Sequence, residues 1–250
     1  MHSYAQTNIQ LFNQLVRLGW NGADLESVIS AYELAASLVT GRFRPSGKTF
    51  LAHLVGTSSI LAALPSPPSL VIAGLLHAAY SAGDFGDGTP GVSEAKRERV
   101  RSAAGSEAEE WVHRYQAFPW TDQTIRTTSG GLDAMSEAQR GVVLMRLANE
   151  LEEFLDRGIL YCGDRKRRAL TDPHRCRLMI DVARRLGYPA LSEELARSVA
   201  EASSELPAEL RRARSANSSY LVAPASYQRL MDSVNARLAA AAQPARKPGE

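Results

Sequence analysis

Two histidines lie inside apolar stretches of the sequence. His53 stands in the run of residues 48–57, and His77 stands in the run of residues 73–80. A buried imidazole must satisfy its ring nitrogens or lose the hydrogen bonds that it makes with water. Two such residues on successive apolar helices predict a shared pocket, and an imidazole in a pocket can move protons near neutral pH.

Four side chains around the second histidine have the spacing of one helix face. His77, Tyr80, Ser81 and Asp84 fall at positions i, i+3, i+4 and i+7, so a continuous helix would place them on one side. A His and a Tyr that converge on a bound molecule can act as acid and base, and a nearby carboxylate can fix the imidazole tautomer. This spacing predicts His77 and Tyr80 as catalytic residues and Asp84 as a substrate-binding residue.

The first histidine has a polar neighbour of its own. Thr57 follows His53 by four residues, so the two side chains share one side of their helix. We therefore predict that His53 is catalytic and that Thr57 contacts substrate. The alternative is that each histidine is a core residue that donates to a backbone carbonyl and has no further role.

The elements that must position these side chains are helices. Apolar residues recur at intervals of three and four, and no alternating strand pattern occurs. The connection at residues 65–68 contains three prolines and is too short for another element, so the two histidine helices are predicted to be antiparallel neighbours. Residues 118–133 read as irregular. The predicted helices are 8–18, 24–39, the two histidine runs, 92–104, 106–116, 136–156, 173–186, 192–203, 207–215 and 226–242.

Composition gives weaker but useful bounds. The chain has 29 Lys and Arg against 27 Asp and Glu, a net charge of +2, so no nucleic-acid partner is expected. Its two cysteines do not have zinc-motif spacing, and a single pair in 250 residues favours a reducing cytoplasm over a secreted scaffold. No stretch approaches the roughly 20 apolar residues of a membrane span. The predicted location is therefore cytoplasmic, with no membrane partner.

The motifs around both histidines resemble a known family. Residues 44–53, 72–79 and 143–149 are similar to the hydrolase domain of the stringent-response guanosine tetraphosphate enzymes, a branch of the HD superfamily. The resemblance covers roughly residues 24–156. An uncharacterised HD-like branch with His-Leu-x-Gly-Thr and Gly-Leu-x-His-x-x-Tyr motifs is more similar still, and residues 53–57 and 74–80 fit it. The resemblance implies an all-α, HD-domain-like helical bundle.

The departures from this family concern the metal. HD phosphohydrolases bind one divalent ion through a first His, a His-Asp pair and a distant Asp; here Ala78 and Asn149 stand at the two carboxylate positions. Two imidazoles and an amide are a poor site for a hard cation, although Asp84 or Asp87 could complete a zinc site by folding back. The prediction is therefore no metal and no cofactor, with Asn149 as a substrate-binding residue.

A basic loop precedes the first histidine. In the resembling hydrolases this stretch lies beside the nucleotide, which implies that Arg42, Arg44 and Lys48 are near an anionic ligand. The guanidinium group suits phosphate and carboxylate equally. We predict that Arg44 anchors a small anionic metabolite, whereas Arg42 and Lys48 fit an ordinary solvated loop.

The domain organisation follows from the helix pattern. Residues 1–160 are predicted as the HD-like core, residues 161–242 as a helical extension packed on it, and residues 243–250 as a disordered tail. The Ala-rich C-terminal helix has two candidate positions, on the core or on a second subunit, and the latter would make a homodimer.

Three functions remain open from sequence. The first is a metal-independent small-molecule enzyme of lyase, cyclase or isomerase type that uses His and Tyr acid–base chemistry. The second is an HD phosphohydrolase with a rebuilt metal site. The third is a catalytically inactive nucleotide-binding or regulatory module that keeps the pocket alone.

Overall fold

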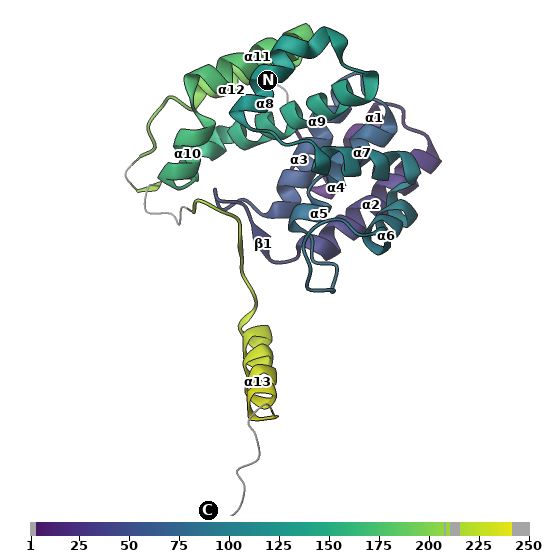
Figure 1. Cartoon of the computed structure of the whole chain (residues 1–250), viewed down its shortest axis with the longest axis vertical. Helices are drawn as coiled ribbons and strands as arrows, with labels where there is room; N and C mark the ends of the chain where they lie inside the picture. Colours follow the sequence, from purple (N-terminus) through teal and green to yellow (C-terminus); the bar gives the residue numbers. More distant parts are fainter. Residues whose placement is uncertain (1–3, 208, 211–215, 242–250) are drawn as a thin grey trace, which may run out of the picture. The chain divides into compact units, whose positions relative to one another are not determined.

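Helices make up nearly all of the regular structure. The computed structural model describes residues 4–207, 209–210 and 216–241, and within these ranges the prediction of an all-α chain is confirmed (Figure 1). The described strands are β1 (Arg42–Phe43) and β2 (Tyr220–Leu221), which form a two-stranded sheet. The site is therefore built by helices and the loops between them.

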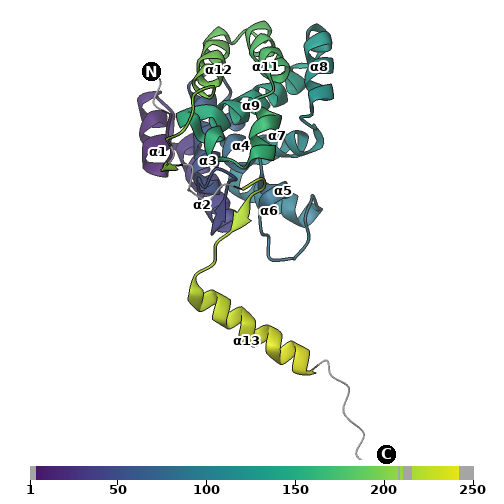
Figure 2. The same ribbon diagram turned by 90° about the vertical axis from the view of Figure 1, so that its left-hand side faces the viewer.

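Three helices form the centre of the bundle. They are α3 (Phe50–Ala62), α4 (Pro68–Leu76) and α9 (Glu137–Phe154), and each packs against the other two (Figure 2). The first two are apolar around most of their circumference, which is the pattern of a helix buried on all sides. The helix predicted over residues 136–156 is confirmed as α9, which begins after the capping residue Ser136.

Other helices surround this centre. Before α3 lie α1 (Asn8–Arg17) and α2 (Gly22–Val39), and after α4 lie the short α5 (Ala79–Ala82), α6 (Glu94–Ala104) and α7 (Ser106–Ala117). Pairs of neighbouring helices bury apolar side chains between them, the main favourable term in folding.

The stretch that reads as irregular in sequence is helical. It forms α8 (Asp122–Gly131) and the short 3-10 helix η1 (Leu132–Ala134). The prediction was wrong because this helix is polar: Thr121 caps it in a reciprocal capping box, and the residues buried in α8 are Ile125 and Thr128. Hydrophobic periodicity therefore gave little signal.

The later helices are the 3-10 helix η2 (Leu155–Tyr161), α10 (Asp164–Leu170), α11 (Pro173–Arg185), α12 (Pro189–Glu201) and α13 (Ala225–Ala241). Three of them, α11, α12 and α13, were predicted from the sequence, whereas η2 and α10 were not. Pro173 and Pro189 stand at first helical turns, where a missing N–H costs nothing. The helix predicted over 207–215 lies largely outside the described residues.

The chain divides into two compact units, Met1–Tyr220 and Leu221–Glu250. The first unit contains α10, α11 and α12 together with the helices of the predicted core. The predicted tail at 243–250 lies outside the described residues. Among the helices described, none has the length and apolar character that a membrane crossing requires.

Candidate functional site

The two predicted histidines lie next to each other. His53 is on α3 and His77 is the residue that ends α4, and their ring centroids are 5.3 Å apart at 69°. Both rings are almost fully buried. The edge of the His77 ring also meets Tyr115 of α7, with centroids 5.1 Å apart. The pair is thus held between three helices.

Each imidazole is tethered through Nδ1. The Nδ1 of His77 lies 2.8 Å from the carbonyl oxygen of Gly74, which can only accept, so Nδ1 carries the proton and Nε2 carries the lone pair. The Nδ1 of His53 contacts the carboxylate of Glu152, which also binds the ammonium of Lys48 at 2.5 Å. His53 Nε2 is buried and has no hydrogen-bond partner within the described part of the chain.

Burial keeps both imidazoles neutral. It lowers the pKa of His77 to about 3, with the neighbouring His53 acting in the same direction. The pKa of His53 falls well below its ordinary value, because of burial first and then of the Arg44 and Lys48 charges. In the free protein at neutral pH the pair therefore offers lone pairs and no positive charge.

A cavity of about 600 Å³ opens beside His77. His77, Ala78 and Asn149 line it, whereas His53 lies behind His77 and does not. The walls combine cationic, aromatic and acidic side chains: Arg42, Arg44, Arg146, Lys166 and Arg175; Phe50, Tyr115 and Trp120; Glu150 and Glu153. A second cavity, of about 510 Å³, contains none of the predicted site residues.

The arginines of the cavity are fixed in place. Arg44 forms an ion pair with Glu153, and its guanidinium lies 5.0 Å from the centre of the Phe50 ring. Arg146 stacks on Tyr115 at 3.6 Å and donates to the Tyr115 carbonyl at 2.7 Å. Such guanidinium–aromatic stacking holds a cation without neutralising it.

Several polar atoms of the cavity walls have no partner. Within the described residues, buried atoms without a hydrogen bond include three guanidinium Nε atoms, one indole nitrogen and one carboxylate oxygen at this cavity, namely those of Arg44, Arg146, Arg175, Trp120 and Glu150. Most buried polar groups in proteins are paired, so a concentration of unpaired ones at one cavity needs an explanation. These atoms are buried in the free protein, so a ligand would supply their partners only if the side chains turned toward it.

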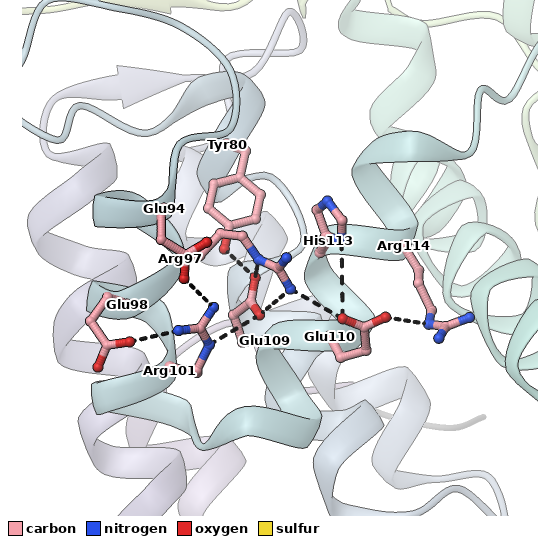
Figure 3. Close-up of polar contacts among 9 residues, drawn as sticks. All are labelled: Tyr80, Glu94, Arg97, Glu98, Arg101, Glu109, Glu110, His113 and Arg114. Atoms are coloured by element: carbon pink, nitrogen blue, oxygen red, sulfur yellow. Dashed lines mark hydrogen bonds and ion pairs between the residues drawn. The ribbon is translucent and has the colours of Figure 1, made fainter.

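Tyr80 does not reach this cavity. Its hydroxyl donates to Glu109 at 2.7 Å, within the cluster of charged residues between α5, α6 and α7 (Figure 3). The expected common side of one helix was wrong, because α4 ends at Leu76 and α5 begins only at Ala79. Burial and Glu109 both raise the pKa of Tyr80, so the hydroxyl remains a protonated donor to Glu109.

The two remaining predicted residues also lie off the cavity. Thr57 donates to the carbonyl of His53 at 3.0 Å inside α3 and is fully buried. Asp84 accepts from the amide of Gly86 at 2.9 Å in an exposed loop and lines a different, smaller cavity. Of the seven predicted site residues, the structure gathers His53, His77, Arg44 and Asn149.

The residues present do not fit a hard divalent cation. Ala78 has no oxygen ligand and Asn149 offers a neutral one, and the described residues contain no group of three His, Cys, Asp or Glu side chains suited to a metal ion. Asp87, the other carboxylate considered for a rebuilt site, pairs with Lys96 at 3.1 Å. The nearby cations Arg44 and Lys48 would oppose a dication electrostatically.

Two glycines of the histidine motifs have a steric purpose. A Cβ on Gly56 would come within 2.7 Å of the Glu152 side chain, so this glycine lets Glu152 approach His53. A Cβ on Gly74 would lie 2.9 Å from the Ser58 Cα, so this glycine lets α4 approach α3. Both support the imidazole pair.

Sequence reasoning missed Glu152, Glu150 and the cations that follow the histidine motifs. Glu150, Glu152 and Glu153 are buried on α9, and three acidic residues along the apolar stripe of a central helix are a usable signal. Lys166 and Arg175 have no comparable signal, because they lie on α10 and α11 and reach the cavity only through the fold.

The comparisons with known proteins assign no reaction to this chain. Residues 34–119 match a family model described as a domain of unknown function (DUF6817). No curated protein matches the chain. Among solved structures, it is similar to one entitled "A metazoan ortholog of SpoT hydrolyzes ppGpp and plays a role in starvation responses". That chain is 18% identical, with 73% of this chain and 97% of that chain covered and a TM-score of 0.49.

Proposed function

We propose that this protein is a small-molecule enzyme that binds an anionic metabolite beside His77 and transfers protons without the metal site of HD phosphohydrolases. The observation that carries the proposal is the cavity beside His77, whose walls hold five cationic side chains and a concentration of unpaired polar atoms. Five cations against two carboxylates leave an excess of positive charge, which raises the local concentration of anions in a cleft. Arg44 and Arg146 have guanidinium groups suited to a phosphate or carboxylate.

His77 is the residue that would move the proton. Its Nε2 lone pair is available because Gly74 holds the Nδ1 proton. A pKa near 3 makes the free imidazole a weak base, but an anion bound close to the ring favours the protonated form and raises this pKa. The substrate therefore brings the base toward its working range. His53, which lies behind His77, acts as a positioning residue.

Acid–base chemistry of this kind serves reactions in which a proton leaves one atom and another atom is protonated, as in many isomerases, lyases and cyclases. Tyr115 lies against His77 and on the cavity wall, so it replaces Tyr80 as the tyrosine beside the proposed substrate. Its pKa is raised by burial, which keeps its hydroxyl protonated.

A binding module without catalysis is the second candidate. It is favoured by the low pKa of His77 in the free protein, since an imidazole that stays neutral keeps a hydrogen-bond acceptor at Nε2. In that case the cavity would hold its ligand unchanged.

One experiment separates these functions. The full-length protein is incubated with a small-molecule cell extract, with and without EDTA. The extract is then compared by mass spectrometry for wild type, His77→Gln and the control His113→Gln, which changes a half-buried histidine that does not line the cavity. We expect a compound consumed by wild type and by His113→Gln, with or without EDTA, and retained but not converted by His77→Gln. A compound that wild type binds but does not convert would support the binding module. Conversion abolished by EDTA would support a hydrolase with a rebuilt metal site.

A further inference from the structure

Glu150 is an acidic residue on a mostly cationic wall. Its side chain is 6% exposed, and its Oε1 accepts from Nη2 of Arg175 at 2.9 Å. Its Oε2 is buried and has no hydrogen-bond partner within the described residues. Glu153, the other carboxylate on this wall, pairs with Arg44 and has no such unpaired oxygen.

Holding Arg175 does not require both oxygens of Glu150. The other end of the same guanidinium already binds Asp122 through Nη1 at 3.0 Å. A buried carboxylate oxygen that lacks a donor costs free energy, because it has given up water and gained nothing in return. The terminal torsion of a glutamate is broad, so rotation about it can bring this oxygen to a donor on a ligand in the cavity.

We infer that Glu150 accepts a hydrogen bond from an N–H or O–H group on the same ligand whose anionic group the cavity cations hold. The ligand class is then a small anion that also carries an amino, amide or hydroxyl group, and Glu150 selects against anions that lack one. A site built to pair a donor rejects the analogue without it, since its own buried acceptor is then left unpaired. This inference rests on the proposed anion-binding function of the cavity.

The test uses matched ligands on the full chain. Binding of 4-aminophenyl phosphate, 4-hydroxyphenyl phosphate, 4-methylphenyl phosphate and inorganic pyrophosphate is measured by isothermal titration calorimetry. The first three differ only in the donor, and their rings suit a wall that contains Phe50, Tyr115 and Trp120. We expect wild type to prefer the amino and hydroxyl esters over the methyl ester by about tenfold, the range of a hydrogen bond to a charged group.

Glu150→Gln should reduce this preference to about threefold or less, because a neutral amide is a weaker acceptor. The same variant should bind pyrophosphate as well as wild type or more tightly, because a negative charge has left a cationic wall. Glu194→Gln is the matched control: Glu194 is also buried, pairs with Arg197 and has an unpaired buried oxygen, but it does not line this cavity. It should keep the wild-type preference.

Two negative results have different meanings. If wild type binds pyrophosphate but binds all three esters equally, the role of Glu150 is overturned and anion binding stands. If wild type binds neither pyrophosphate nor the esters, the proposed function fails. Should Glu150→Gln not fold, as judged by its melting transition, the order of the three esters on wild type decides the question.

Discussion

Two clusters of charged residues in this protein are built on opposite plans. In the cluster of Figure 3, between α5, α6 and α7, Arg97 binds the carboxylate of Glu109 through two nitrogens at 2.8 and 2.7 Å. Arg101 in turn binds Glu94 at 2.8 Å and Glu98 at 2.6 Å. No side-chain atom of these residues is both buried and unpaired in the described structure.

The wall of the cavity beside His77 has the opposite balance. Five cationic side chains face two carboxylates there, and the pKa of Lys166 is lowered by burial and by the charge of Arg44. Unfavourable charge arrangements of this kind cost stability and concentrate where a protein binds or reacts. The two clusters differ in how completely their cations are paired with carboxylates. This pairing, and not the number of charges, distinguishes the structural cluster from the candidate site.

Removing the centre of the Figure 3 cluster should have the largest effect on stability. Glu109→Ala leaves the Tyr80 hydroxyl and Arg97 without their main partner, and we expect a loss of about 3 kcal/mol in the free energy of unfolding, measured by urea denaturation. Pyrophosphate binding should be unchanged in the folded protein. Glu110→Ala, which removes a half-exposed carboxylate of the same cluster, should cost less than about 1 kcal/mol. Equal losses in the two variants would contradict the structural role of Glu109.

The buried histidine should make the cavity region sensitive to acid. Folded His77 stays neutral down to about pH 3, whereas an unfolded histidine takes up a proton near pH 6.5, so the unfolded state binds more protons between these values. The free energy of unfolding should therefore fall with pH from about 6.5 downward, by up to about 1.4 kcal/mol per pH unit from this residue.

Urea denaturation at several pH values measures this effect. The curve for His77→Gln should be flatter than that for wild type, whereas His113→Gln, which changes a half-buried histidine outside the cavity, should be closer to wild type. Parallel curves for wild type and His77→Gln would show that the imidazole is not held neutral.

A single lysine should separate binding from stability. Lys166→Gln removes a cation from the cavity wall and relieves its repulsion with Arg44, so we expect about fivefold weaker pyrophosphate binding with equal or greater stability. Lys96→Gln is the matched control, because Lys96 is buried but satisfied by the carbonyl of Gly91 and the carboxylate of Asp87. It should lower stability and leave binding unchanged. A Lys166→Gln variant that is less stable than wild type and binds pyrophosphate equally well would contradict this prediction. Lys166 would then behave like a residue of the structural cluster.

The sequence allowed most helices to be predicted, because their signals are local. Apolar spacing, the cap at Ser136 and the proline at Pro173 each act within a few residues. The same local reasoning placed His53 and His77 on successive helices. It failed at Tyr80, because nothing local shows that the helix is interrupted after Leu76.

The rest of the site depends on contacts between distant residues. Lys48 and Glu152 are 104 positions apart, and Glu150 meets Arg175 across two different helices. An i, i+4 interpretation would pair Arg146 with Glu150, but Arg146 instead binds backbone carbonyls of residues 115 and 118. Only the packing of α9 against its neighbours decides which partner each charge receives.

The carbonyl of Gly74 has a consequence for how this site can change. Because a main-chain oxygen sets the tautomer of His77, no single amino-acid replacement deletes that acceptor, whereas one replacement at Glu152 would release His53. The orientation of the His77 ring is thus set by the course of the backbone itself. Substitutions can change the side chains around His77 more easily than they can change the direction of its Nε2 lone pair.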